Sequence, residues 1–321
     1  MSDPVVSIVV RTYNRPERLK VCLDSLADQS YRDFEAVVVN DAGSDVQPVI
    51  DSLADRLVCN YVSHETNRGR TVALNTGVTS ARGRYVGFLD DDDIVYPDFL
   101  QTLVPKALES DLPVIYSDVK NVTFEQNPDT GEWKRVLEHL TYSFDFERNN
   151  FLLGNYIPVN CLLIRRDCFD EVGLFDPTLT VFEDWDFLIR LSRKHDFVHI
   201  AKITGEYRRW DDNSNMVERE RYHEAGEIIR ERYKNERNEI FDEVFKSTFS
   251  LKREMRKKDE SIQQLSWQLR QATARLAEAG QLAARQQEEI RVLKQQIAKN
   301  DTTRTDQKNS QDRDSNESSR Q

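Results

Sequence analysis

Four consecutive aspartates, Asp90 to Asp93, are the residues whose types and spacing point most directly to chemistry. They follow the apolar run Tyr85 to Leu89, and carboxylates this close together repel one another, so they need full solvation or a bound cation. Charged surface turns are common, and a DXD pattern alone is weak support for a metal site. A hard cation such as Mg²⁺ or Mn²⁺ uses one or two carboxylates and adds phosphate and water, so a diphosphate is the natural ligand.

A second acidic cluster, Glu183-Asp184-Trp185-Asp186, precedes the apolar helical segment Phe187 to Leu191. Acidic residues at a helix N-terminus complement the helix dipole, which is a sufficient structural explanation. The functional interpretation is that one carboxylate is a general base that deprotonates an acceptor hydroxyl. Neither a Ser-His-Asp nor a Cys-His pattern competes with it, and the five histidines lack metal-ligand spacing.

The elements around these clusters are expected to alternate between strand and helix. The apolar runs Val5 to Val10 and Phe34 to Val39 are typical of strands buried on both faces of a parallel sheet, and Leu57 to Val62 and Tyr85 to Leu89 predict a third and a fourth strand. Helical spacing predicts helices over Glu17 to Gln29, over Val46 to Leu57 and over a segment ending at Ala81. This alternation indicates an α/β fold with a mainly parallel sheet, in which ligands bind beyond the carboxyl ends of the strands.

Polar residues that follow these strands should therefore gather at one crevice. Asp41 could be a helix N-cap or turn residue, or it could accept a hydrogen bond from a base or ribose. Tyr13 could pack against the next helix, or it could stack on a nucleobase beside Thr12 and Asn14. Arg70 could be a surface cation, or it could balance phosphate charge.

The region after the acidic run is expected to be less regular. The patterns predict a helix over Pro97 to Glu109, a strand over Val114 to Ser117, a hairpin between residues 121 and 137, an extended segment over Asn155 to Arg165 and a short helix from Cys168 that Gly173 stops. This region should form a second half beside the parallel sheet.

Composition divides the 321 residues into a core-forming part and a polar part. Charged residues make up 31% and apolar residues 38%, which is too polar for a wholly globular protein of this size. The excess lies after Val217, so we expect a core in residues 1–217 only. The net charge of −11 does not favour binding to nucleic acid or to an anionic membrane.

Residues 218–299 carry a heptad seam. Apolar positions alternate spacings of three and four from Phe241 to Ile297, and from Ile262 the seam spans five heptads with Gly280 beside it and Gln286 in it. A lone amphipathic helix is the alternative, but no adjacent domain covers the stripe, so we expect a coiled coil that forms a homo-oligomer. Residues 300–321 are polar and are expected to be disordered.

Targeting signals are not evident in the sequence. It has no apolar run long enough for a transmembrane helix, and the N-terminus lacks a basic region before its short apolar run. The four cysteines are scattered without a CxxC pair. We therefore expect a reducing, cytoplasmic location, and a peripheral position at the inner face of the membrane is the alternative.

The ordered set of motifs resembles family 2 glycosyltransferases with the GT-A fold. The segments that carry the resemblance span about residues 4–215 and are Val5 to Arg15, Val39 to Asp41, Asn67 to Gly69, Ala81 to Tyr85, Phe88 to Asp93 with Pro97, and Phe182 to Asp186 with Arg190. Each motif alone is weak, but their order is specific. The resemblance implies an inverting transfer of a sugar from a nucleotide-diphosphate sugar, with Mn²⁺ or Mg²⁺ as cofactor.

The resemblance also implies roles for individual residues. The nucleoside pocket would be lined by Arg11, Thr12, Tyr13, Asn14 and Asp41, with Arg70 and Asn75 alongside. In the acidic run, Asp90 and Asp91 would contact ribose and donor sugar, Asp92 would bind the metal and Asp93 would cap the helix or turn that follows. Asp184 would be the base, and the acceptor would be faced by Glu183, Trp185, Asn155 and Ile157.

Two departures from the family pattern limit the resemblance. Processive members carry transmembrane helices and a QxxRW motif, whereas here Glu206 holds the Gln position of the segment that ends at Trp210. Polymerisation through a self-made pore is therefore not expected. Many members also supply a late histidine to the metal or diphosphate; near Trp210 the sequence offers only Arg208 or Arg209 as a substitute.

The leading hypothesis is a glycosyltransferase acting on a glycan or lipid-linked acceptor in bacterial surface polysaccharide or glycoconjugate synthesis. The alternative is a non-catalytic GT-A scaffold that acts through its coiled coil, which the intact Asp92 and Asp184 disfavour. A sugar nucleotidyltransferase would need a glycine-rich N-terminal loop that this sequence lacks.

Overall fold

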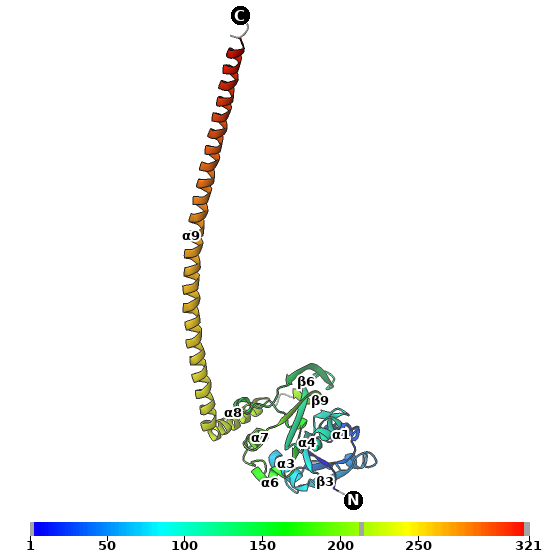
Figure 1. Ribbon diagram of the computed structural model, residues 1–321. Helices are drawn as coiled ribbons and strands as arrows, with labels where there is room; N and C mark the ends of the chain where they lie inside the picture. Colours follow the sequence, from blue (N-terminus) through cyan, green and yellow to red (C-terminus); the bar gives the residue numbers. More distant parts are fainter. Residues whose placement is uncertain (1–2, 212–214, 318–321) are drawn as a thin grey trace. The chain divides into compact units, whose positions relative to one another are not determined.

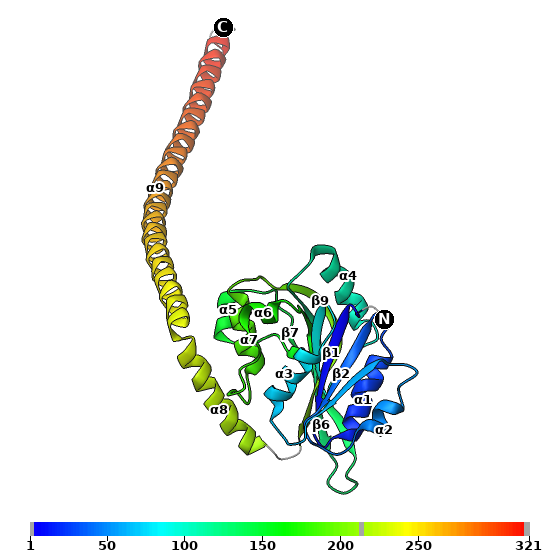
Figure 2. The same cartoon turned by 90° about the horizontal axis from the view of Figure 1, so that it is seen from below.

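The computed structural model describes residues 3–211 and 215–317 and divides the chain into two units, Met1–Phe241 and Asp242–Gln321 (Figure 1). In its described residues the first unit contains a nine-stranded mixed sheet. Its strand order is β3 (Cys59–Ser63), β2 (Phe34–Asn40), β1 (Val6–Thr12), β4 (Tyr85–Asp90), β8 (Leu162–Arg165), β6 (Val114–Gln126), β9 (Val198–Asp211) and β5 (Ile94–Val95), and β7 (Trp133–Tyr142) pairs with β6. Helices cover both faces of this sheet (Figure 2). The predicted α/β class with helices on both faces of the sheet is confirmed, and the sheet is parallel throughout its first half.

The first half of the sheet consists of parallel strands at the predicted positions. The strands are β1 (Val6–Thr12), β2 (Phe34–Asn40), β3 (Cys59–Ser63) and β4 (Tyr85–Asp90). In β1, Val6, Ile8 and Val10 pack in one core cluster, whereas Val9 packs in the other. Successive strand residues point to opposite faces, so a continuous apolar run is what a strand between two helical layers requires.

Two helical layers complete the cores. One core is covered by α1 (Pro16–Ala27), α2 (Gln47–Asp51) and α4 (Phe99–Ser110). The other is covered by α3 (Arg70–Ser80), α5 (Arg148–Leu153), α6 (Cys168–Val172) and α7 (Glu183–Ser192). Helix α2 is much shorter than the predicted span Val46 to Leu57, because turns replace its second half.

The second half of the sheet is more regular than the sequence indicates. Its strands are β5 (Ile94–Val95), β6 (Val114–Gln126), β7 (Trp133–Tyr142), β8 (Leu162–Arg165) and β9 (Val198–Asp211), and the 3₁₀ turn η1 (Val159–Cys161) precedes β8. The predicted hairpin is β6 with β7, and its strands are longer than expected. Strand β9 was not predicted, because polar Thr204 and Glu206 are buried along it and break the apolar pattern.

The first unit extends beyond the predicted boundary at residue 217. Helix α8 (Asn215–Arg232) and the start of α9 (Lys234–Glu317) bury Ile229, Tyr233 and Ile240, so the unit ends at Phe241. Arg232 also pairs with the fully buried Asp186 at 2.6 Å.

The second unit is helical in its described residues. Helix α9 continues to Glu317 and so enters the segment 300–321 for which composition predicts disorder, since that segment lacks proline and glycine that would end a helix. Among the described residues, no helix combines the length and the apolar character that are needed to cross a membrane.

Candidate functional site

The candidate residues lie where the parallel strands end. Strand β1 ends at Thr12, β2 ends at Asn40 and β4 ends at Asp90, the first residue of the acidic run. In the strand register, Arg11 lies beside Asp90 and Thr12 lies beside Asn40. The predicted crevice at the carboxyl edge of the sheet is therefore where the first motif and the acidic run meet.

Arg11 connects the two acidic clusters through a buried guanidinium. Its Nε atom lies 2.8 Å from Asp90 Oδ1, and its Nη1 atom donates a hydrogen bond to Glu183 Oε1 at 3.0 Å. Arg70 adds a second cation, with Nε 3.2 Å from the same Glu183 oxygen. The residue expected to line a nucleoside pocket is thus placed as a bridge that brings the two distant clusters together.

Asp91 and Asp92 are paired with groups from β1 and from the start of α1. Thr12 Oγ1 donates a hydrogen bond to Asp91 Oδ2 at 2.7 Å. Arg15 Nη1 lies 3.4 Å from Asp91 Oδ1 and 3.1 Å from Asp92 Oδ2, and Arg18 Nη1 lies 3.7 Å from the same Asp92 oxygen. Two arginines that the sequence reasoning did not assign therefore face the predicted metal ligand.

The crowding of carboxylates changes their acidity. Burial raises the pKa of Asp92, and the charges of Asp90 and Asp91 raise it further, to about 6. Burial also raises the pKa of Asp91 above its ordinary value. Burial opposes ionisation of Asp90 as well, but the charges of Arg11 and Arg70 outweigh it and hold the pKa of Asp90 below its ordinary value. The negative charge of Asp90 is thus compensated by nearby cations, whereas the charges of Asp91 and Asp92 are compensated only in part.

Asp93 does not cap the following helix, contrary to expectation. Its carboxylate is buried and accepts hydrogen bonds from Asn160 Nδ2 at 2.9 Å and from the backbone N–H of Arg208 at 2.6 Å. Helix α4 instead begins after Asp98. Asp93 therefore ties the acidic run to η1 and to β9, because it lies in a turn directed into the sheet and not toward α4.

Asp41 organises the loop that precedes α3. Its carboxylate accepts hydrogen bonds from the backbone N–H groups of Arg68 at 2.9 Å and Gly69 at 2.8 Å, and it lies 2.7 Å from Nδ1 of His64. The N-cap of α2 is Val46, so the capping alternative for Asp41 is wrong. These bonds fix the turn from which α3 and its first residue, Arg70, begin.

The loop between β1 and α1 presents Tyr13 to solvent. Tyr13 is 49% exposed, so its ring is not packed under the following helix. Asn14 has a positive φ of 56°, and its Oδ1 atom accepts a hydrogen bond from the backbone of Ser44 at 2.8 Å. A side chain on Gly43 would approach the backbone nitrogen of Asn14 to 2.6 Å, so this tight packing requires glycine there.

Asp184 lies in the first turn of α7, next to a strained residue. Phe182, the N-cap, has a left-handed backbone with φ 62°, which is uncommon for a bulky side chain. Asp184 Oδ2 accepts a hydrogen bond from Asn155 Nδ2 at 3.2 Å, and its Oδ1 accepts one from the backbone of Trp185 at 2.8 Å. Burial and the adjacent charge of Glu183 raise the pKa of Asp184 to about 6.

Comparison with known proteins identifies the family. The family model for Glycosyl transferase family 2 matches residues 7–173, which include β1 from its second residue onward, the acidic run and the strands between them. This chain belongs to glycosyl transferase family 2.

Bacterial relatives of this family 2 member agree with the match. The uncharacterized glycosyltransferase YwdF of Bacillus subtilis is 32% identical over 190 residues, which cover 59% of this chain and 69% of YwdF. EpsJ of the same organism is 31% identical over 206 residues, which cover 61% of this chain and 58% of EpsJ. The match covers less than two thirds of the length of EpsJ and of several other curated relatives.

Solved structures agree on the fold of the family 2 domain. TarS of S. aureus, residues 1–349, has a TM-score of 0.55 at 19% identity, over 70% of this chain and 64% of that chain. The same protein in complex with UDP has a TM-score of 0.53 at 20% identity, over 63% of this chain and 60% of that chain. These likenesses support the GT-A fold, and the family indicates glycosyl transfer.

The residues expected to face an acceptor have different surroundings. Ile157 is fully buried in a core cluster, and Trp185 donates its indole N–H to the carbonyl of Phe151 at 2.9 Å, so both side chains pack inward. The side chain of Asn155, in contrast, contacts the carboxylate of Asp184. The amide of Asn75, expected beside the nucleoside, binds both the N–H and the carbonyl of Phe175 at 3.0 and 2.9 Å.

Arg208, one of the two late arginines offered as a substitute for a family histidine, already has partners within the protein. Arg208 Nε donates a hydrogen bond to Glu206 Oε2 at 2.9 Å, and its guanidinium lies 5.5 Å from the ring centroid of Phe124. Glu206 also accepts a hydrogen bond from Arg135 at 2.9 Å. Glu206, at the position of glutamine in the family motif, thus links β9 to β7 through its ion pair with Arg135.

Sequence reasoning missed Arg15, Arg18, His64 and Asn160. Arg15 and Arg18 carry a detectable signal, because a spacing of three at a predicted helix start puts both on one side of the helix. His64 and Asn160 carry none, since each meets its aspartate only through the tertiary fold.

The carboxylate oxygens of the acidic run fit a hard divalent cation. The run offers oxygen donors only, and the raised pKa of Asp92 shows that its negative charge lacks full compensation. Mg²⁺ and Mn²⁺ prefer such donors and use few protein ligands when phosphate supplies the rest.

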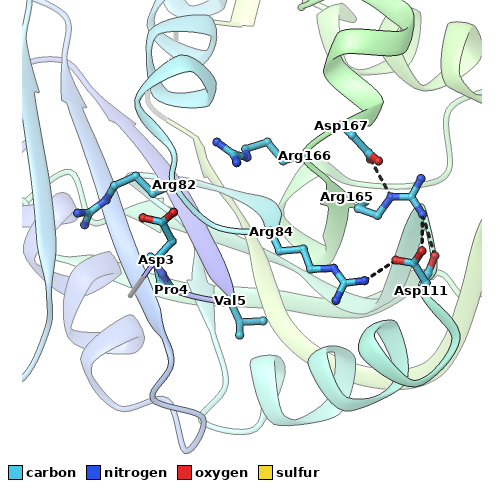
Figure 3. A pocket seen from close by; sticks show the side chains of 9 residues that line it. All are labelled: Asp3, Pro4, Val5, Arg82, Arg84, Asp111, Arg165, Arg166 and Asp167. Carbon is cyan, nitrogen blue, oxygen red and sulfur yellow. Dashed lines mark hydrogen bonds and ion pairs between the residues drawn. The ribbon is translucent and has the colours of Figure 1, made fainter. Parts of the chain in front are cut away.

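A cavity of about 490 Å³ lies away from the acidic run, at the amino edge of the parallel strands (Figure 3). Its lining residues are Asp3, Pro4, Val5, Arg82, Arg84, Asp111, Arg165, Arg166 and Asp167. Arg84 pairs with Asp111 at 2.7 Å and Arg165 pairs with Asp167 at 2.7 Å. The charges in each pair compensate one another, and we assign this cavity no part in the chemistry.

Proposed function

We propose that this protein transfers a sugar from a nucleotide-diphosphate sugar to a hydroxyl group, with inversion at the sugar carbon. Asp92 would hold a divalent Mn²⁺ or Mg²⁺, and Asp184 would be the general base. The acceptor would be a glycan or a lipid-linked glycan in bacterial surface polysaccharide or glycoconjugate synthesis. The location would be cytoplasmic, with the protein soluble or peripheral at the membrane.

The observation that carries this proposal is the bridge through Arg11. Its guanidinium contacts both Asp90 and Glu183, which are far apart in the sequence. Asp92 follows Asp90 closely, and Asp184 follows Glu183 directly. The bridge therefore supports a single site that has one carboxylate for the leaving diphosphate and another for the acceptor proton.

The chemistry of Asp184 supports its role as a base. A carboxylate whose pKa is about 6 is largely ionised at neutral pH and is a stronger base than an ordinary aspartate. Asn155 and the backbone of Trp185 hold its two oxygens in place. As the acceptor oxygen forms its bond to the sugar carbon, its proton passes to Asp184 and the electron pair of the breaking bond leaves with the diphosphate. A bound divalent cation supplies Lewis acidity to that leaving group.

The donor's nucleoside would lie near the loops after β1 and β2. Exposed Tyr13 offers a ring for stacking, and Thr12 and Asn14 offer polar groups beside it. Asp41 lies there too, although its oxygens already accept bonds from the loop before α3. Asp90 and Asp91 would contact the ribose and the donor sugar.

The exposed seam of α9 supports a homo-oligomer formed by a coiled coil. Ile262, Leu265, Leu269 and Leu276 are each between 59% and 73% exposed in the single chain. Removing residues 242–321 should leave a protein with measurable transfer and a lower mass in light scattering, because the first unit ends at Phe241. An unchanged number of chains per particle would contradict the coiled coil.

The test of the proposed function is transfer or donor hydrolysis with Mn²⁺, first using donors selected by thermal stabilisation. Asp184→Asn and Asp92→Ala should each lower the rate by about 10²- to 10⁴-fold, whereas Asp170→Asn, on the exposed side of α6, should leave it unchanged. Equal rates in all variants would reject the site and favour a non-catalytic scaffold.

A further inference from the structure

Two arginines at the start of α1 lie in the crevice beside the acidic run. Arg15 and Arg18 both face Asp92, with Nη1 atoms 3.1 Å and 3.7 Å from its Oδ2 atom. Their side chains are 47% and 22% exposed, so both remain accessible to a ligand. The carboxylate that we propose as the metal ligand therefore has two cations next to it.

Aromatic rings fix the position of Arg18. Its guanidinium carbon lies 4.3 Å from the ring centroid of Trp210 and 5.7 Å from that of Trp133. Trp210 in turn stacks on Phe124, with centroids 4.5 Å apart. A ring face attracts a cation without carrying an opposing formal charge. These rings thus hold the guanidinium of Arg18 in position beside Asp92.

The contacts of Asp92 indicate a ligand for the two arginines. In the ligand-free protein, Arg15 faces Asp91 and Asp92, and Arg18 faces the same oxygen of Asp92. A divalent cation on Asp92 would compete with both guanidinium groups for this carboxylate. An anion bound to the cation would then lie beside the two arginines, and the planar guanidinium group matches phosphate oxygens in pairs. The diphosphate is the part of the donor that meets both requirements.

We propose that Arg15 and Arg18 exchange Asp92 for the diphosphate of the donor and stabilise it as the leaving group. This inference rests on the proposed function. Negative charge grows on the diphosphate as its bond to the sugar carbon breaks, so both arginines bind the departing group more strongly than the donor. Arg15 and Arg18 would thus supply the positive charge at the diphosphate that Arg208, which pairs with Glu206, does not supply. The competing explanation is that both only neutralise Asp92.

Binding of inorganic pyrophosphate to the full-length protein separates the two explanations. Titrations at saturating Mg²⁺ compare the wild type with Arg15→Met, Arg18→Met and the double variant. Arg56→Met is the matched control, because Arg56 pairs on the surface with Asp24 and Asp28. Each crevice substitution should weaken binding roughly tenfold, and the control should change it less than about twofold. Arg18→Lys should lose part of the affinity, because an ammonium lacks the planar fork.

Titration with Mn²⁺ alone and thermal melting complete the experiment. Pyrophosphate affinity within about twofold of wild type in the double variant, together with tighter Mn²⁺ binding, would overturn the inference and leave neutralisation as the role. In that result pyrophosphate binding would still depend on Asp92, and the proposed function would stand. A wild-type protein that binds neither pyrophosphate nor any nucleoside diphosphate would overturn both. Melting temperatures show whether a variant has lost its fold. If the methionine variants have, the pyrophosphate affinity of Arg18→Lys decides between the two explanations.

Discussion

The two edges of the parallel sheet place buried carboxylates in opposite surroundings. At the amino edge, Glu35 accepts hydrogen bonds from Ser7 Oγ at 2.7 Å and from Arg82 Nε at 3.1 Å. Burial opposes its ionisation, but the hydrogen bonds from Arg82 and Ser7 outweigh burial and hold the pKa of Glu35 below its ordinary value. At the carboxyl edge, burial and neighbouring carboxylates raise the pKa of Asp92 and of Asp184 to about 6.

This difference separates structural charge from charge that is available to a ligand. Glu35 has donors within the protein that stabilise its ionised form, so it needs no external partner. Asp92 and Asp184 have fewer compensating partners than their burial requires, and a cation or a proton would lower their energy. The carboxyl edge thus carries an electrostatic cost in the ligand-free protein, which a bound cation would reduce.

Replacing Arg11 should have the largest effect on this arrangement. Arg11→Met leaves Asp90 and Glu183 close together without their shared cation, and removal of one partner from a buried ion pair costs about 3 kcal/mol or more of unfolding free energy. Urea denaturation measures that loss. Arg70→Met is the control, because the half-exposed Arg70 contacts Glu183 from the solvent side and should cost less. Equal losses in the two variants would contradict a bridging role for Arg11.

Replacing Glu35 should reduce stability without reducing transfer. Glu35→Gln keeps the shape of the side chain but weakens charge-assisted hydrogen bonds from Ser7 and Arg82, at a cost of about 2 kcal/mol. Transfer by the folded protein should equal that of the wild type, since Glu35 lies at the edge away from the acidic run. A lower rate at a temperature where the variant is fully folded would show that the two edges are coupled.

The sequence predicted the first half of the fold well because local rules determine it. Runs such as Val6 to Val10 are apolar at every position, and only a strand between two layers buries all of them. Strand β9 escaped prediction because Thr204 and Glu206 point inward, where Ser117 and Arg135 provide their partners. Such pairs join residues far apart in the chain, so no local pattern reports them.

The candidate site also has residues that the sequence could predict and residues that it could not. Asp92 and Asp184 could be selected from motif and position, and the structure places their clusters on the two sides of Arg11. The surroundings of Ile157 and Trp185 could not be predicted, because a residue beside a motif can point into the core as well as toward a ligand. The roles of all these residues remain predictions for the experiments above.

The rate of transfer should depend on pH through Asp184. The base must be ionised, so a pKa of about 6 predicts a rate that falls about tenfold per pH unit below that value and levels off above it. Donor binding, measured separately at each pH, corrects for protonation at the acidic run.

Glu35 provides the contrast: its lowered pKa means that its stabilising contribution is present above the ordinary glutamate pKa and is lost only as the pH falls further. Transfer should therefore fail at a higher pH than the Glu35 contribution to stability, and a flat rate between pH 5 and about 7 would contradict Asp184 as the base.

The smallest effects should come from the exposed ion pairs beside the amino-edge cavity. Arg84→Ala and Arg165→Ala each remove one partner of Asp111, and more than half of the Asp111 side chain is exposed to water. Solvent and salt screen such pairs, so each melting temperature should change by less than about 2 °C, and 0.5 M salt should reduce even that difference. Transfer should be unaffected. A substantial loss of stability in either variant would mean that ion pairs at this edge contribute as much as those around Arg11, and burial would then not explain the difference between the edges.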